Sequence, residues 1–203
     1  MAKTLYLMRH GRTMFNEKHL IQGWCDSPLS ELGHRQAEGA ARLLRARGVE
    51  FDYACCSDTV RAAETLEHVT GIPFDRLRGL RELFFGELEG ESTDLVSGPG
   101  IESFEQRCRV IRAAGGESYE HLRERAVGTL RQVMDDPARA CVLAVAHGDL
   151  MRQCYAAWSG ASAARYEEPM QNCCIFVCTY DDGSFRIEEI VNENLAGAAG
   201  AGA

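Results

Sequence analysis

The chain has 203 residues, 45% of them hydrophobic, which is enough to bury one substantial core, so a single domain over residues 1–194 is expected. Its formal net charge of −8 argues against a nucleic-acid-binding protein, which needs a basic surface. No apolar run approaches a membrane span, and the first predicted strand leaves no room for a signal peptide, so neither membrane association nor secretion is expected.

The chain contains nine cysteines, and no two of them are spaced as Cys-x-x-Cys. Zinc sites usually show such paired spacing, so we expect no metal site. Most of these cysteines fall in apolar, strand-like runs, where a thiol behaves as a small buried hydrophobic group. A reduced, cytoplasmic protein is the expectation.

The first predicted element is a short buried strand at residues 4–8, followed directly by Arg9, His10 and Gly11. Ligands of open α/β sheets bind outside the carboxyl ends of the strands, so a cation and an imidazole at this position are well placed for chemistry. Taken alone, the tripeptide is equally compatible with a basic strand end and a surface histidine.

Residues 12–28 show no clear periodicity and contain Asn16, Gln22 and Gly23. They predict a loop that folds over the end of the first strand. A loop of this length in a compact domain is usually functional.

A helix is predicted to begin at the N-cap Ser30 and to end at Gly48. A second strand at 51–56 follows, and the next helix has Arg61 in its first turns and ends at Gly71. This order brings Arg61 near the carboxyl edge of the sheet, although an exposed helix arginine would have the same pattern.

The run at 81–90 is too rich in glycine for a regular element and too aromatic for a solvated loop. Phe84 and Phe85 can desolvate Glu82 and raise its pKa, as a general acid requires. The acidic residues that follow are interpreted as solvated charges: Glu87, Glu89 and Glu91.

Residues 91–116 are interpreted as a lid or a partner surface, with one short helix at 102–113. Arg107, Arg109 and Arg112 lie in this helix at spacings that cannot all share one face. A solvated helix face is the favoured interpretation of these arginines. The hypothesis beside it is that at least one of them reaches the part of a substrate that is not transferred and sets specificity.

A helix is predicted from the N-cap Ser118 to about residue 135, and the most apolar run of the chain, 141–146, predicts a central parallel strand. This strand ends in His147 and Gly148, and a helix follows at 149–158. The order of strand, histidine and glycine therefore occurs twice.

Two segments, 172–180 and 185–191, flank Asp181-Asp182-Gly183 and predict a hairpin at the edge of the sheet. Residues 195–203 are almost all alanine and glycine and are expected to be a disordered tail.

Strand ends thus supply Arg9, His10 and His147, with Arg61 nearby and Glu82 in an apolar environment. Two arginines suit a phosphoryl group, because the guanidinium fork matches its oxygens and stays charged. A neutral imidazole is a competent nucleophile, and a second histidine can donate to the equatorial oxygens. These residues predict phosphoryl transfer from a small phosphorylated metabolite.

Seven short motifs together resemble the histidine phosphatase superfamily, also called phosphoglycerate-mutase-like, and the resemblance covers the chain from Leu5 to about Phe185. The motifs are Arg9-His10-Gly11-Arg12-Thr13-x-x-Asn16, Gln22-Gly23-Trp24-Cys25-Asp26-Ser27-Pro28-Leu29, Gly33-x-x-Gln36-Ala37, Ser57-Asp58-x-x-Arg61-Ala62-x-x-Thr65, Glu82-x-x-Phe85-Gly86-x-x-Glu89-Gly90, Gly116-Glu117-Ser118 and His147-Gly148.

The resemblance implies a three-layer α/β/α sandwich around a mostly parallel sheet of five or six strands. It implies that His10 is phosphorylated during turnover, that Glu82 is the proton donor, and that no metal or other cofactor is needed. The remaining substrate contacts would come from Arg9, Asn16, Gln22, Gly23, Arg61, His147 and Gly148. Oligomeric state stays open, with a homodimer among the alternatives.

The residues after the acid distinguish the branches of the superfamily. Its cofactor-dependent mutases are expected to read Tyr-Gly-x-Leu-Gln-Gly-Leu-Asn-Lys there and to have a longer insert with paired arginines. In this chain residues 85–93 read Phe-Gly-Glu-Leu-Glu-Gly-Glu-Ser-Thr, so the tyrosine and the lysine are missing and acidic residues are added. Acidic residues repel a bisphosphate, so a phosphatase is favoured and a phosphoglycerate mutase is the alternative.

A non-catalytic phosphate-binding module is disfavoured, because none of the five central residues is replaced. Asp149, directly after His147 and Gly148, adds a negative charge for which the sequence offers no explanation.

Overall fold

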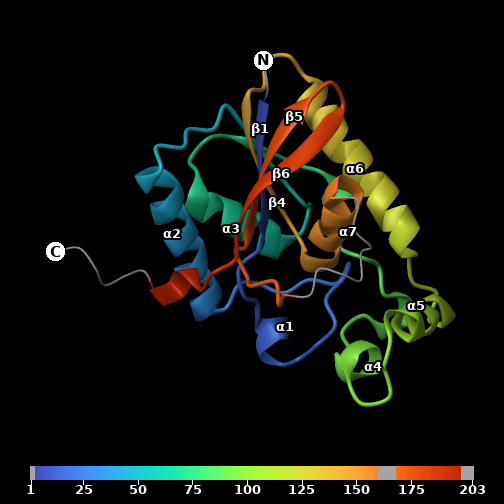
Figure 1. Ribbon diagram of the computed structural model, residues 1–203. Coiled ribbons are helices and arrows are strands. Elements are labelled where there is room, and N and C mark those ends of the chain that lie inside the picture. The colour runs from blue at the N-terminus through green and yellow to red at the C-terminus, as the bar shows by residue number, and fades with distance from the viewer. Residues whose placement is uncertain (1–2, 160–167, 198–203) are drawn as a thin grey trace.

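The computed structural model describes residues 3–159 and 168–197 and shows a sheet with helices on both faces (Figure 1). Its helices and strands, in chain order, are β1 (Lys3–Arg9), α1 (Met14–Glu17), α2 (Glu31–Ala46), β2 (Tyr53–Cys56), α3 (Val60–Val69), β3 (Phe74–Arg76), α4 (Asp94–Ser97), α5 (Phe104–Ala113), α6 (Tyr119–Asp135), β4 (Cys141–Ala146), α7 (Gly148–Ser159), β5 (Ile175–Asp181) and β6 (Ser184–Val191).

The sheet has six strands in the order β3-β2-β4-β1-β5-β6. The first four in this order run parallel, β5 is antiparallel to β1, and β5 and β6 form the predicted hairpin at one edge. β1 and β4 are therefore neighbours at the centre, and both run in the same direction. This pairing brings the two strand-histidine-glycine sequences to the same edge of the sheet.

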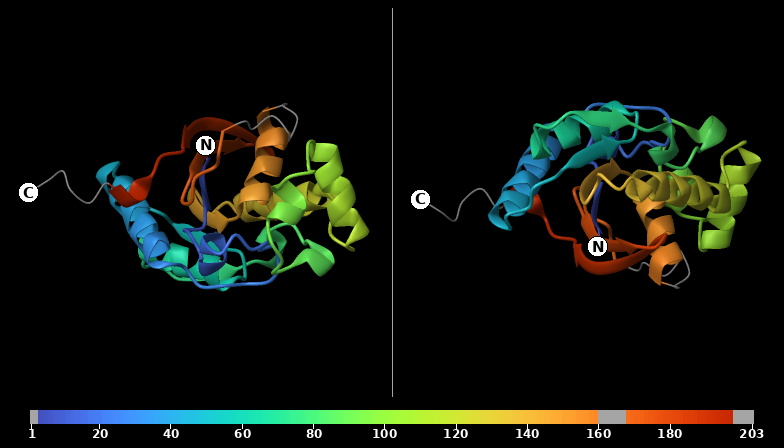
Figure 2. Two further views of the ribbon diagram at one scale, coloured as in Figure 1. Left: turned by 90° about the horizontal axis from the view of Figure 1, so that it is seen from below. Right: turned by 90° about the horizontal axis from the view of Figure 1, so that it is seen from above.

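Alternation along the two central strands explains the three layers, as predicted. Successive side chains of a strand point to opposite faces. Leu5 and Leu7 of β1 pack in the cluster that contains residues of α6 and α7, whereas Met8 packs in the cluster of α2 and α3. Figure 2 shows the two helix layers on either side of the sheet. Because both faces are covered, β4 is apolar along its whole length, and the middle of β1 consists of Leu5, Tyr6, Leu7 and Met8.

Two non-sheet segments lie at the end of the molecule where β1 and β4 terminate (Figure 1). The first is 12–28, where Thr13 and Asn16 form a reciprocal capping box around the short helix α1. The second is 91–116, which contains α4 and α5, and Ser103 and Gln106 form another capping box at the start of α5. The segment at 12–28 is thus a loop with one short helix, not an entirely irregular loop.

Two expectations from the sequence need correction. The edge strand β3 was not predicted, because three residues beside Pro73 are too few to show a period. The tail also begins later than expected, since Leu195 lies in a short 3₁₀ helix and is buried in the cluster of α2 and α3. Residues 198–203 of the predicted tail lie outside the described residues. In the part of the chain that the structure describes, no helix is long and apolar enough to cross a membrane.

Candidate active site

His10 lies at the carboxyl end of β1 and is almost completely buried. Its Nδ1 is 2.7 Å from the carbonyl oxygen of Gly11. A carbonyl oxygen can only accept, so Nδ1 carries the proton and Nε2 presents a lone pair. Desolvation, together with the positive charges of Arg61 and Arg9, lowers the pKa of His10 well below its ordinary value. The imidazole is therefore neutral and has the tautomer that a nucleophile needs.

His147, at the carboxyl end of the neighbouring strand β4, has the opposite tautomer. Arg61 Nε donates a hydrogen bond of 3.2 Å to His147 Nδ1, so that nitrogen is unprotonated and Nε2 carries the proton. Burial and the charge of Arg61 lower the pKa of His147 well below its ordinary value. The two histidine rings are 5.2 Å apart between centroids. One ring thus offers a lone pair and the other a donor.

The guanidinium of Arg61 is completely buried and is bound by the loop at 23–26. Its Nη1 donates to the carbonyl of Cys25 at 3.0 Å and to Asp26 Oδ1 at 2.9 Å, and its Nη2 donates to the carbonyl of Gly23 at 2.7 Å. The alternative of an exposed helix arginine is therefore wrong. Neither Arg61 nor Gly23 lines the pocket described below; both reach the site by orienting His147.

Gly23 is required for a steric reason. A Cβ at this position would lie 2.2 Å from the carbonyl oxygen of Leu83 and 2.3 Å from Glu89 Oε1. Both are fixed parts of the neighbouring loop, so no larger residue fits there. The close approach explains a glycine that sequence reasoning assigned to substrate binding.

Glu82 is buried beside Phe85, and its carboxylate accepts three backbone hydrogen bonds. Leu83 N and Leu150 N donate to Oε1 at 2.9 and 3.0 Å, and Asp149 N donates to Oε2 at 2.9 Å. These N–H groups favour the charged carboxylate. Desolvation and the negative charge of Asp149 outweigh them and raise the pKa of Glu82 above its ordinary value. A carboxyl group with a raised pKa can act as a proton donor near neutral pH.

Arg125 of α6 holds the loop that positions Glu82, and sequence reasoning missed it. Its guanidinium donates to the backbone carbonyls of Gly79 and Arg81 at 3.1 and 2.6 Å and to that of Glu82 at 2.7 Å. The same group forms an ion pair of 2.7 Å with the buried carboxylate of Glu117. No local pattern identifies such a residue, because its partners are carbonyls about 45 positions away.

Glu89 also differs from the prediction, which treated it as a solvated charge. Its carboxylate accepts from the backbone N–H groups of Gly23, Trp24, Cys25 and Phe85 at 2.9–3.1 Å. It therefore joins the loop at 23–25, which orients Arg61, to the segment that contains Glu82. Glu87 and Glu91 are exposed, in agreement with the prediction.

A cavity of about 140 Å³ opens beside these residues. Its lining consists of Arg9, His10, Asn16, Leu20, Ile21, Gln22, Glu82, Phe85, Thr93, Val96, Ser97 and Arg107. Of the predicted site residues, the cavity brings together Arg9, His10, Asn16, Gln22 and Glu82. His147 and Gly148 do not line the cavity, and a Cβ at Gly148 would only reach ordinary van der Waals contact with Arg9 Nε, at 3.4 Å.

Two buried nitrogen atoms near His10 indicate the chemistry of the site. Within the described ranges, four buried side-chain nitrogen atoms have no hydrogen-bond partner, and two of them, Arg9 Nε and His147 Nε2, belong to the site. Buried polar groups in folded proteins are almost always paired, so two unpaired donors next to a nucleophile are candidate contacts for a ligand. Both nitrogen atoms are donors, and they lie beside the neutral His10. The arrangement fits an anion with several oxygen atoms, and a phosphoryl group has this chemistry.

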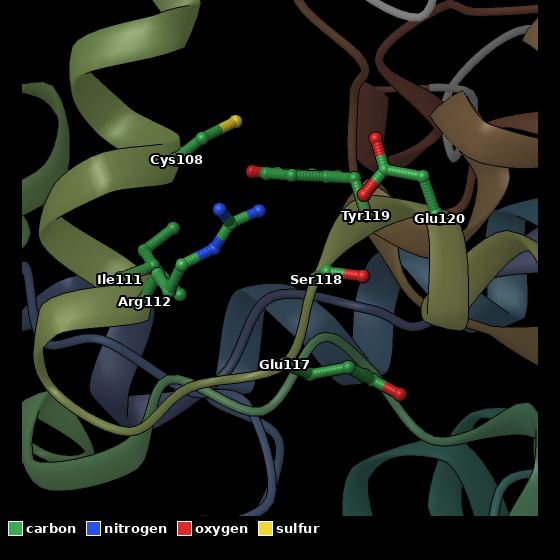
Figure 3. Close-up of a pocket in the computed structure, with 7 residues that line it drawn as sticks. All are labelled: Cys108, Ile111, Arg112, Glu117, Ser118, Tyr119 and Glu120. Carbon is green, nitrogen blue, oxygen red and sulfur yellow. The ribbon is translucent and has the colours of Figure 1, made fainter.

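The three arginines of α5 separate clearly in the structure. Arg107 lines the cavity, whereas the side chain of Arg109 is 67% exposed and lies 4.0 Å from Glu105. Arg112 borders a different, smaller hollow (Figure 3). Only Arg107 is placed to contact a molecule in the cavity.

A comparison with protein families matches residues 5–193 to the histidine phosphatase superfamily, branch 1. The chain belongs to this superfamily. Its members include mutases and phosphatases that act through a phosphohistidine, so the chain is an enzyme of this phosphoryl-transfer class. The fold and the family expected from the sequence are both confirmed.

Individual relatives differ in the activity that their names state. The chain is 34% identical to a 2,3-bisphosphoglycerate-dependent phosphoglycerate mutase of Nitrobacter winogradskyi over 74% of this chain and 78% of the relative. A phosphoglycerate mutase of Bacillus anthracis superimposes with a TM-score of 0.82 at 28% identity, covering 96% of this chain and 95% of the other. A mycobacterial glucosyl-3-phosphoglycerate phosphatase superimposes with a TM-score of 0.74 at 26% identity, covering 95% and 99%. The named sequence relatives thus favour the mutase alternative over the phosphatase prediction.

Proposed function

We propose that this chain is a phosphomonoesterase that transfers the phosphoryl group of a small phosphorylated metabolite to His10 and then to water. The observation that supports the proposal is the pair of complementary tautomers. Nε2 of His10 has the lone pair, while Nε2 of His147 and Nε of Arg9 are buried donors beside it. A nucleophile and two donors for the equatorial oxygens are the minimum that such a transfer requires.

In the first step the lone pair of His10 Nε2 attacks phosphorus, and the bond from phosphorus to the ester oxygen breaks. Glu82 gives its proton to the departing oxygen, so the alcohol leaves neutral. In the second step Glu82, now a carboxylate, takes a proton from water as the water oxygen attacks phosphorus. The phosphorus–nitrogen bond breaks, the electron pair returns to His10, and inorganic phosphate leaves. Arg9 and His147 donate to the phosphoryl oxygens throughout.

The charges around the cavity favour water as the acceptor. Beyond Arg9, the cation among the lining residues is Arg107, and Asp149 partly neutralises it at 2.7 Å. A mutase must hold a bisphosphate by both ends, which places several negative charges in one pocket. The cavity lining instead includes neutral side chains, among them Thr93, Ser97 and Val96.

A phosphoglycerate mutase is the second candidate, and the names of the relatives support it. One sequence argument against it also becomes weaker. The carboxylate of Glu89 is bound by four backbone N–H groups and does not line the cavity, so it does not repel a bisphosphate there. Arg107 would be the group that binds the second anionic end.

One experiment separates the two candidates. The enzyme is incubated with a panel of phosphorylated metabolites and, separately, with 3-phosphoglycerate plus a 2,3-bisphosphoglycerate primer. We expect release of inorganic phosphate from at least one member of the panel, with kcat/KM at least tenfold above that for isomerisation of 3-phosphoglycerate. Faster isomerisation, with no phosphate release, would establish the mutase instead.

A trapping experiment tests the assignment of the nucleophile. Turnover is quenched under non-acidic conditions, and the labelled peptides are identified. The phosphate should be labile in acid, stable in base and confined to the peptide that contains His10. A label on His147 would reverse the roles of the two histidines.

A further inference from the structure

Asp149 contacts both Glu82 and the segment at 91–116. It lies in the first turn of α7, directly after His147 and Gly148. Its backbone N–H donates to Glu82 Oε2 at 2.9 Å, and its carboxylate accepts from Arg107 Nη2 at 2.7 Å. Only 16% of its side chain is exposed, so this charge acts where solvent screens it weakly.

Arg107 connects this carboxylate to three further parts of the structure. Its Nε donates to Tyr119 Oη at 2.7 Å, its Nη1 donates to the carbonyl of Val96 at 3.1 Å, and its guanidinium lies 5.7 Å from the centre of the Phe85 ring. Figure 3 shows Tyr119 pointing from the start of α6 toward α5. Arg107 therefore links α4, α5 and α6 to the first turn of α7, and it also lines the cavity.

Several charged or titratable groups surround Glu82, and their signs differ. Asp149 is the acidic group whose charge disfavours ionisation of Glu82. The others are Arg9 and His10 from the end of β1, Arg61 from α3, His147 after β4, Arg107 from α5, and Tyr119 and Arg125 from α6. Most of these are cations or neutral groups, so without Asp149 the carboxyl would face mainly positive charge and would lose its proton more easily.

We propose that Asp149 is a positioning residue that keeps the proton on Glu82, and that Arg107 weakens this effect by neutralising part of the charge of Asp149. The proposal rests on Glu82 as the proton donor in the proposed function, and it applies equally to a phosphatase and a mutase because both begin with the same transfer. Arg107 also lines the cavity. An anionic substrate group that attracts Arg107 away from Asp149 would therefore make Glu82 lose its proton less readily.

The two partners of this ion pair should have opposite effects, which a purely structural role would not produce. Asp149→Asn removes the negative charge and leaves Arg107 unpaired, so both changes favour the ionised Glu82. Arg107→Met removes the positive charge and leaves Asp149 with the hydrogen bond from Tyr119 Oη but no cation, so the ionised Glu82 becomes less favourable. A single nearby charge shifts the pKa of a buried carboxyl group by about one unit or more.

The experiment measures kcat/KM for an alkyl phosphate as a function of pH. The high-pH limb of this profile reports the loss of the proton from the acid in the free enzyme. We expect the limb to move down by about one pH unit in Asp149→Asn and up by a similar amount in Arg107→Met. Arg109→Met, in the exposed neighbour of the same helix, is the matched control and should leave the limb in place.

Arg107→Lys separates charge from packing, because lysine keeps the charge but cannot reproduce the three bonds of the guanidinium. We expect a limb within about 0.3 pH units of that of the unmodified protein, well inside the shift expected from losing the charge. Movement of the limb in the same direction in Asp149→Asn and Arg107→Met, or no movement in either, would overturn the proposal. If Glu82→Gln retains the same high-pH limb, the assignment of Glu82 as proton donor in the proposed function has failed, since another group is then the acid.

Discussion

Glu89 offers the sharpest test of how the loops of the site are held together. Glu89→Gln keeps the shape of the side chain but replaces one carboxylate oxygen with an NH₂ group. Oε1 accepts from Trp24 N and Phe85 N, and Oε2 accepts from Gly23 N and Cys25 N. The amide can therefore keep one pair of bonds, while its NH₂ group faces the two N–H donors of the other pair.

The expected loss of stability follows from this count of bonds. A hydrogen bond to a charged group contributes about 1.5–3 kcal/mol, and a buried donor left unpaired costs a similar amount. Two lost bonds, with local relaxation of a half-buried loop, correspond to about 3 kcal/mol. For a chain of this size that value lowers Tm by about 6–12 °C. Activity should fall as well, because the same loop binds the guanidinium that orients His147.

The assay measures the free energy of unfolding of Glu89→Gln in urea, with circular dichroism as the signal. It also measures kcat/KM on the same preparations. Glu87→Gln is the matched control, since Glu87 lies two residues away and is exposed. We expect the control to change the free energy of unfolding by less than about 0.5 kcal/mol. A loss below about 1 kcal/mol in Glu89→Gln, or one equal to that of the control, would refute the reasoning.

Three further predictions concern the catalytic groups. Glu82→Gln should slow the burst phase of an alkyl phosphate by about a hundred- to ten-thousand-fold. The burst phase of p-nitrophenyl phosphate should slow far less, because p-nitrophenolate leaves without a proton. Equal slowing of both would show that Glu82 only positions the phosphate. The pKa values of His10 and His147 are lowered, so below about pH 6.5 the unfolded chain binds more protons than the folded chain. Stability present above that pH should therefore be lost as the pH falls, by up to about 1.4 kcal/mol per pH unit for each histidine. Urea unfolding between pH 5 and 8 measures this slope, and a flat profile contradicts the prediction. Activity should survive dialysis against a chelator, since cationic and N–H donors already face the cavity; a large loss restored by zinc, manganese or magnesium would contradict this prediction.

Local patterns in the sequence were sufficient for most of the fold. β4 was predicted with its observed bounds, and α2, α3, α6 and the edge hairpin were each predicted within a few residues. Their signals are short-range: apolar periodicity, N-cap residues and glycine stops. β3 and the packing of Leu195 had no such signal, because each depends on contacts with elements distant in the chain.

The sequence by itself also determined which residue types gather at the active site, since two strands that end in histidine and glycine must meet when the strands lie parallel and adjacent. Only the tertiary structure decided what each group does there. The tautomers of His10 and His147 depend on a carbonyl and a guanidinium beside their ring nitrogens. Glu89 and Asp149 make these contacts with partners 42–67 positions away in the chain. A charge that looks solvated in sequence can be bound by backbone N–H groups that only folding brings to it.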